Sequence, residues 1–384
     1  MDQLPITAFA EPTDDLTYQN LSKSQQKAYD VVDENRTLYQ ETESTLKHGV
    51  LIVGSWGSGK SQVLRVMKKN KLIGLILERG QIYREIGEDV ELKDEETIRN
   101  ILDNMIKKVN NIIKQAKNND ESPPPFIALD NPDIPLGSNV TEEAAYRFTW
   151  RLLEEATFGR LPYLVVTLNE FTYRKFEEER KHSLAKISQH FDIIFLEWNS
   201  DDLERAIRTR LPRIYLTISR RKLAREVAEV ARAPRSAIFL FARALVKRKS
   251  PIDLIIEDGI KDAFDQYVRI LSQSGYKLSK AKSKKWIDVW RNIIKHKRDL
   301  VEGLIKREGV LTRELYDALG KDYKVSHWPV TAATRYHIIE KPEPLSYRFT
   351  DEFLAASAEY AAGLGYTASG ILKNMAELYG RIGR

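Results

Sequence analysis

The sequence predicts an α/β fold in which a mainly parallel sheet is followed by a helical region. Short apolar runs alternate with segments of helical periodicity as far as residue 198, an alternation typical of parallel βαβ units. The expected strands cover residues 49–53, 72–77, 126–130, 163–168 and 192–197. A glycine-rich motif follows the first strand directly, and beyond residue 198 helical segments predominate.

The order of elements can be written from hydrophobic periodicity and from capping and breaking residues. In the first half, the expected helices cover residues 23–48, 61–69, 93–117 and 141–157. In the second half they cover residues 200–210, 220–231, 236–249 and 258–272, and then 299–307, 312–319 and 325–337. A short strand at residues 345–349 precedes a last helical region.

Length and composition restrict the class of protein. A chain of 384 residues is longer than one hydrophobic core usually supports, so we expect more than one domain. The absence of cysteine excludes disulfides, thiolate metal sites and thiol catalysis. No apolar run approaches the roughly 20 residues that cross a bilayer, so we expect a cytoplasmic protein without a membrane partner. The net charge of +6 is compatible with an anionic partner but does not require one.

The motif GSWGSGKS matches the phosphate-loop pattern G-x-x-x-x-G-K-[ST] in full. Glycine tolerates the backbone angles that curl a loop around an anion, and the loop N–H groups then point at the phosphates at a helix N-terminus. We expect Lys60 to bridge the β- and γ-phosphates and Ser61 to bind Mg²⁺, so ATP and Mg²⁺ are the expected cofactors. The candidate nucleotide-binding residues are Gly54, Ser55, Trp56, Gly57, Ser58, Gly59, Lys60 and Ser61. The alternative is a Gly/Ser-rich loop with an accidental lysine, which the flanking strand and helix disfavour.

A carboxylate that could complete the metal site ends the strand FIALD at Asp130. The alternative is a surface aspartate that merely follows a buried strand. Many hydrolytic P-loop enzymes place glutamate at the next position, but this chain has Asn131, whose amide cannot accept a proton. We therefore expect slow hydrolysis, or a carboxylate supplied by Asp133 or Glu170.

The order of the later motifs resembles that of AAA+ ATPases. Asn169 follows the apolar strand at 163–168 and resembles the sensor-1 residue, with Thr167 as a weaker candidate. Arg235 resembles the sensor-2 arginine, which reaches the γ-phosphate from a helical lid. The simpler alternatives are a strand-capping asparagine and a surface arginine. The resemblance implies a catalytic set of Lys60, Asp130, Asn131, Asn169 and Arg235.

Residues 299–349 are expected to form three helices and a hairpin, similar to a winged helix, whose third helix can enter the major groove of DNA. The candidate DNA-binding residues are Lys324, His327, Thr331 and Arg335 on or near the third helix, and Arg348 in the hairpin. The alternative is that this module binds protein or only packs. The basic stretch at 277–298 contains Trp286 and Trp290. It either lines phosphates or turns its tryptophans into the core.

The chain as a whole resembles AAA+ ATPases of the archaeal origin-recognition type. It also resembles archaeal signal-transduction-type P-loop ATPases and transposon target-selection ATPases. The resemblance implies a P-loop AAA+ core with a parallel sheet, an all-helical lid and a C-terminal winged-helix domain. The expected boundaries are 1–44 for an arm and helix, 45–198 for the core, 199–276 for the lid, 277–298 for a basic linker and 299–384 for the winged helix and C-terminal helices.

This resemblance implies an ATP-dependent, nucleoid-associated protein that binds double-stranded DNA as a nucleotide-gated switch. Its role would lie in replication initiation or in DNA transactions such as transposition. It also implies assembly as a homo-oligomer or with partner AAA+ subunits, although the sequence shows no clear arginine finger. The alternative is a signal-transduction-type ATPase or scaffold whose winged helix binds protein.

Overall fold

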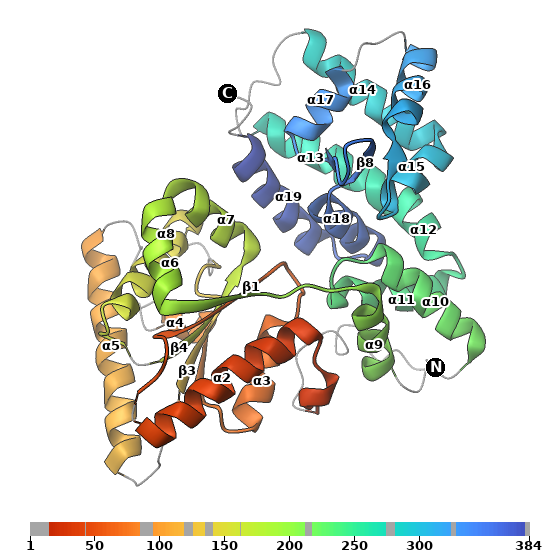
Figure 1. Cartoon of the computed structure of the whole chain (residues 1–384). Helices are drawn as coiled ribbons and strands as arrows, with labels where there is room; N and C mark the ends of the chain where they lie inside the picture. The colour runs from red at the N-terminus through yellow and green to blue at the C-terminus, as the bar shows by residue number, and fades with distance from the viewer. Residues whose placement is uncertain are drawn as a thin grey trace. The chain divides into compact units, whose positions relative to one another are not determined.

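A computed structural model describes residues 15–42, 44–84, 95–118, 126–134, 141–161, 163–211, 217–273, 281–323 and 328–380. The chain divides into two compact units with a boundary between Glu197 and Trp198 (Figure 1). The N-terminal unit comprises residues 12–197 and the C-terminal unit residues 198–384. Within the residues that the structure describes, no helix combines the length and the apolar character needed to span a bilayer.

The N-terminal unit contains the predicted parallel sheet. Its strands are β1 (Gly49–Gly54), β2 (Ile73–Glu78), β3 (Phe126–Asp130), β4 (Leu164–Asn169) and β5 (Phe191–Phe195). They lie in the order β2-β3-β4-β1-β5, and every neighbouring pair is parallel. β4 therefore lies between β1, which leads into the phosphate loop, and β3, which ends in Asp130.

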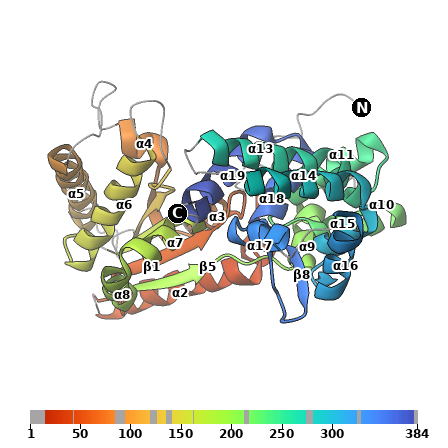
Figure 2. The same cartoon turned by 90° about the horizontal axis from the view of Figure 1, so that it is seen from above.

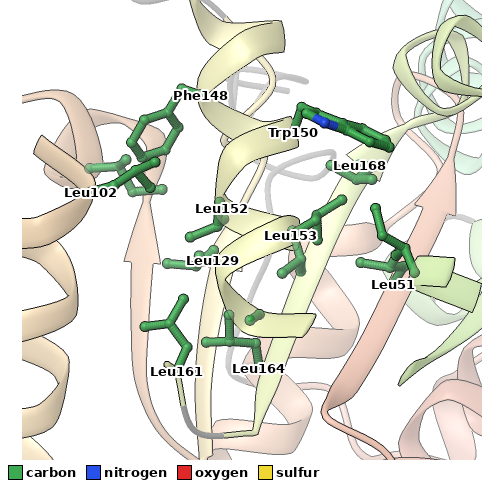
Figure 3. Close-up of a cluster of buried hydrophobic side chains, with 14 of the residues drawn as sticks. Leu51, Leu102, Leu129, Phe148, Trp150, Leu152, Leu153, Leu161, Leu164 and Leu168 are labelled. Carbon is green, nitrogen blue, oxygen red and sulfur yellow. The ribbon is translucent and has the colours of Figure 1, made fainter. Parts of the chain in front are cut away.

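Helices cover both faces of this sheet (Figure 1). They are α2 (Lys23–Thr42), α3 (Lys60–Lys69), α4 (Arg79–Arg84), α5 (Glu95–Asn118), α6 (Glu142–Thr157), α7 (Glu170–Glu179) and α8 (Lys181–His190), after the short 3-10 helix η1 (Tyr18–Asn20). Side chains alternate across a strand, so β1 sends Leu51 and Val53 into one buried cluster and Val50 and Ile52 into another. The first cluster includes Trp150 of α6 and Leu102 of α5 (Figure 3).

One helix prediction was wrong in this unit, and other helices were not predicted. The helix expected to reach residue 48 ends at Thr42, and His48 already makes the backbone hydrogen bonds that lead into β1. His48 N–H donates to the carbonyl of His190, and the His48 carbonyl accepts from Leu164 N–H. The helices α7 and α8 were not predicted at all, since residues 170–190 are dominated by charged side chains with weak apolar periodicity.

The C-terminal unit is mostly helical. Its first elements are α9 (Ser200–Arg210), α10 (Ile218–Val230), α11 (Pro234–Lys247), α12 (Pro251–Leu254), the π-helix η2 (Ile255–Ile260), α13 (Lys261–Gln273) and α14 (Ala281–His296). They are followed by α15 (Arg298–Ile305), β6 (Val310–Leu311), α16 (Thr312–Tyr323), α17 (Trp328–Arg335), β7 (Ile339–Glu340) and β8 (Ser346–Phe349). The three strands form an antiparallel sheet in the order β6-β8-β7, and the winged helix stays a prediction.

Two further helices, α18 (Asp351–Ala362) and α19 (Gly365–Gly380), end the described chain. The hydroxyl of Thr350 caps α18 by accepting from Phe353 N–H. Both helices pack on α13, and α18 also packs on α11 and η2 (Figure 2). At Gly259 of η2 a Cβ atom would lie 2.4 Å from the carbonyl oxygen of Ser357 in α18, so only glycine permits this approach. The expected subdivision of this unit at residues 276 and 298 stays a prediction.

The two tryptophans of the basic stretch face the core, as one of the two interpretations predicted. Trp286 stacks on Tyr336 with 5.6 Å between ring centroids, and Trp290 is fully buried. The Trp290 indole N–H donates to the carbonyl of Pro329 at 3.0 Å. Helix α14 therefore packs against α17 through these buried tryptophans. The side chains of residues 277–284 lie outside the described part of the chain.

Candidate nucleotide site

The sheet order brings the predicted site residues of the N-terminal unit to one edge. Gly54 of β1 lies opposite Asn169 of β4, and Asp130 of β3 lies opposite Thr167 of β4. The carboxyl ends of parallel strands share this edge, where ligands of open α/β sheets bind. The predicted phosphate loop, metal carboxylate and polar sensor are thus neighbours.

The phosphate loop has the backbone that its glycines permit. Gly57 and Gly59 have φ angles of 72° and 84°, and Gly59 directly precedes α3, whose N–H groups point out of the helix start. A Cβ atom at Gly54 would lie 2.5 Å from the hydroxyl of Ser58. From α2, the amide of Gln25 donates to the Gly59 carbonyl at 3.0 Å. The loop is therefore a closely packed cradle at a helix N-terminus.

Lys60 places its ammonium inside this cradle. Its side chain is buried, and Nζ donates to the carbonyls of Gly54 at 2.7 Å and Ser55 at 3.0 Å. Ser61 follows in the first turn of α3. Trp56 is half-buried, and its indole N–H has no hydrogen-bond partner among the described residues. Backbone N–H groups, a buried lysine and a hydroxyl together fit the anionic phosphates of a nucleotide and its Mg²⁺.

Asp130 is held by a small hydrogen-bond network. Its Oδ1 accepts from the hydroxyl of Thr167 at 2.7 Å and from the side-chain amide of Asn131 at 2.9 Å. The Thr167 oxygen in turn accepts from Asn131 N–H at 2.8 Å. Asn131 has a left-handed φ of 53°, which asparagine tolerates better than most residues. Thr167, rated below Asn169 from the sequence, thus orients the carboxylate together with Asn131.

Thr167→Val is expected to lower the free energy of unfolding of the N-terminal unit by about 1–3 kcal/mol, because it leaves buried polar groups of Asp130 and Asn131 without their partner. Urea unfolding followed by circular dichroism measures this loss. Thr149→Val is the matched control, since the buried hydroxyl of Thr149 donates only to a carbonyl of its own helix. Equal losses in the two variants would contradict the proposed network.

Asn169 both caps a helix and presents an amide to the site. Its Oδ1 accepts from Phe171 N–H at 2.9 Å, which starts α7. Its Nδ2 is buried and has no hydrogen-bond partner in the described part of the chain. Asn169 thus caps the helix that follows the strand, this cap leaves the amide N–H₂ group available to a ligand, and the sensor role stays a prediction.

A carboxylate that the sequence left as one of two options, Asp133, lies beside Asn169. Asp133 Oδ2 accepts from the backbone N–H of Asn169 at 2.9 Å and from the hydroxyl of Thr172 at 2.6 Å. Burial raises the pKa of Asp133, while these hydrogen bonds and the nearby Lys60 charge act in the opposite direction. The other option, Glu170, pairs with Arg174 at 2.5 Å on the surface of α7.

Arg235 belongs to the C-terminal unit and lies in the first turn of α11. It is close to Glu359 of α18, whose pKa is raised to about 7 by burial, with the Arg235 charge acting in the opposite direction. Three residues earlier, the buried Arg232 donates to Asp351 at 2.8 Å and to the carbonyl of Ile305 at 3.3 Å. The loop before α11 is therefore tied to α15 and α18. The reach of Arg235 to a nucleotide stays a prediction.

The structure describes only part of the predicted DNA-binding set. Thr331 and Arg335 are exposed, four residues apart on α17, so they share one face of the helix. Lys324 and His327 lie outside the described residues. Arg348 is half-buried and pairs with Glu340 across the hairpin at 2.7 Å, so its charge is already neutralised within the module.

No protein-family model matches this sequence, and no curated protein matches it. Several solved structures are similar to the chain. ORC2 from Aeropyrum pernix, in ADPNP and ADP complexes, has 13% identity and a TM-score of 0.41, covering 95% of this chain and 97% of that one. A DNA replication initiation factor has 15% identity and a TM-score of 0.45, covering 84% of this chain and 98% of the other.

The replication initiator DnaA, bound to AMPPCP and single-stranded DNA, has 13% identity and a TM-score of 0.42, covering 83% of this chain and 96% of its own. These similar structures carry the names of replication initiators of the ORC and DnaA types.

Proposed function

We propose that this chain is an ATPase that binds ATP with Mg²⁺ at residues 54–61 and acts as a nucleotide-gated switch on double-stranded DNA. The observation that carries the proposal is the Lys60 ammonium, buried within a loop of left-handed glycines and directed at the Gly54 and Ser55 carbonyls. A phosphate group offers oxygens of greater negative charge to the same ammonium. Ser61 and Asp130 would hold Mg²⁺, which would neutralise phosphate charge.

The remaining candidates have complementary proposed roles. Asn169 would contact the terminal phosphate or the attacking water from the sheet edge. Arg235 would bind the γ-phosphate from the lid, and the neighbouring Arg232 would pass any displacement to α15 and α18 through its contacts with Ile305 and Asp351. We propose assembly with further copies or with partner AAA+ subunits, and a place in replication initiation or transposition.

A second candidate function is a signalling ATPase whose C-terminal module binds protein. It is favoured by two apolar side chains, Leu311 and Leu345, that are 55% and 72% exposed. Leu311 lies opposite Ser346, and the N–H of the next residue, Thr312, donates to the Leu345 carbonyl at 2.8 Å. With Arg348 already paired to Glu340, this edge is less cationic than its sequence suggests.

Binding of duplex DNA at two salt concentrations, with ATP and with ADP, separates the two functions. Affinity should fall steeply with salt, because each neutralised phosphate releases counterions. Arg335→Ala is expected to weaken binding roughly tenfold, within the range for loss of one arginine contact. Fluorescence anisotropy with a labelled duplex, and with a single-stranded probe beside it, measures both effects.

The matched control is Arg225→Ala, which removes an exposed arginine of α10 that pairs only loosely with Glu204 at 3.3 Å. This variant should bind DNA as the wild type does. Salt-insensitive or absent binding, or equal losses in the two variants, would contradict the DNA-binding proposal and favour the protein-binding alternative.

A further inference from the structure

Asp133 is a buried carboxylate at the nucleotide edge that the expected metal site does not use. Its side chain is only 7% exposed, and isolated buried carboxylates are costly unless they are compensated. Oδ2 accepts two hydrogen bonds, from Asn169 N–H and the Thr172 hydroxyl. Oδ1 is buried and has no partner among the residues that the structure describes. Oδ2 is thus held in place by two hydrogen bonds, and Oδ1 is left to bind a ligand or a water molecule.

A turn after β3 brings this carboxylate back to the sheet edge. Asn131 adopts its left-handed conformation directly before Pro132, and Ile134 N–H donates to the Asn131 carbonyl at 3.2 Å. This tight reversal sets Asp133 against the end of β4 and the start of α7. Next to it, Asn169 presents its buried Nδ2, which also has no partner in the described chain. An acceptor and a donor, both unused, therefore lie side by side at the phosphate loop.

We infer that Asp133 accepts the proton of the water that attacks the γ-phosphate, taking over the task of the glutamate that Asn131 replaces. This inference rests on the proposed ATPase function. In the step, the water oxygen forms a bond to the γ-phosphorus while the bond from that phosphorus to the β–γ bridging oxygen breaks. The bond electrons remain on the ADP oxygen, and the water proton passes to Asp133 Oδ1. The products are ADP and inorganic phosphate.

The other polar side chains nearby are less suited to this task. Asn131 is an amide, and its Nδ2 is already committed to Asp130 at 2.9 Å. Glu170 is one-third exposed and bound to Arg174 on the surface of α7. Its charge is therefore screened, and this ion pair holds its carboxylate on the helix surface. Asp133 is buried and oriented by two donors, and burial raises its pKa, with these hydrogen bonds and the Lys60 charge acting in the opposite direction. A desolvated carboxylate is also a better proton acceptor than an exposed one.

Asp133→Asn in the full chain tests the inference. The amide oxygen can still accept from Asn169 and Thr172, so we expect an intact fold and a melting temperature at or above that of the wild type. Single-turnover hydrolysis of ATP with Mg²⁺ should fall about 10²–10⁴-fold, the usual contribution of a general base. ATP affinity should change by less than about threefold, because ground-state binding is retained. Nucleotide extracted after gel filtration should be ATP from the variant and ADP from the wild type.

Glu170→Gln is the matched carboxylate-to-amide control and should hydrolyse ATP within about threefold of the wild type. Thr172→Val tests the positioning of Asp133 without removing it. It should lower kcat roughly tenfold with KM unchanged, because a group held only for the chemical step affects kcat alone.

The outcomes are distinguishable. Near-normal hydrolysis in Asp133→Asn, loss in Glu170→Gln, or an unchanged kcat in Thr172→Val where Asp133→Asn fails to fold would each overturn the inference. A wild type that binds ATP and never hydrolyses it would also overturn it, while leaving the nucleotide-binding proposal intact. A wild type that binds no ATP would overturn the proposed function itself.

Discussion

Lys60→Ala is expected to lower the affinity for ATP at least about a hundredfold, equivalent to about 2.7 kcal/mol. The ammonium lies inside the phosphate loop, held by two loop carbonyls. It is the cation that would meet the β- and γ-phosphates. Charge-assisted hydrogen bonds contribute about 1.5–3 kcal/mol each, so loss of those to two phosphates accounts for an effect of this size. The backbone N–H groups of the loop cannot replace the missing charge.

Isothermal titration with ATP and Mg²⁺ measures this loss. Lys68→Ala is the control, because Lys68 lies on the same helix, α3, with an exposed side chain in its last turn. Its removal changes the net charge of the chain equally and should leave ATP affinity unchanged. If Lys60→Ala and Lys68→Ala bound ATP equally well, residues 54–61 would not be a nucleotide site.

Trp290→Ala is expected to lower the free energy of unfolding of the C-terminal unit by about 3–5 kcal/mol, the usual cost of truncating a buried aromatic side chain. Trp290 is 0% exposed, packs on Phe349 of β8 and donates to the Pro329 carbonyl of α17. The truncation would leave a cavity under the helix that carries Thr331 and Arg335.

Urea unfolding followed by circular dichroism measures this destabilisation, with Lys285→Ala as the control on the same helix. Lys285 is exposed, and exposed substitutions usually change stability by less than about 0.5 kcal/mol. Trp290→Phe should lie between the two, since it keeps most of the apolar volume and loses the hydrogen bond. A loss below about 1 kcal/mol in Trp290→Ala would contradict the buried position of this side chain.

The local parts of the candidate nucleotide site were predictable because they follow from contiguous residues. Gly54 to Ser61 carry the loop, its lysine and its helix start within eight positions, and Asp130 ends an uninterrupted apolar strand. The expected parallel sheet is confirmed in the structure. These features depend on backbone preferences and periodicity, which act over short distances along the chain.

The parts that depend on strand register could not be predicted. Thr167 orients Asp130 only because β3 and β4 are neighbours with these two residues opposite each other. Asp133 reaches Asn169 only because Asn131 turns the chain. Arg348 meets Glu340 across a hairpin, which cancels a charge that the sequence presents as available. In each of these contacts the two residues meet only in the folded chain, so no local sequence pattern predicts the contact.

The close approach of Gly259 to Ser357 has a mechanical consequence. The backbones of Gly259 and Ser357 approach so closely there that no side chain fits between them. Arg232 adds a second tether, to Asp351 at the start of the same helix. Helix α11 also packs on α18, so α18 is held at its start by the Arg232 pair and further along by the Gly259 contact. A side chain at position 259 would have to push η2 away from α18.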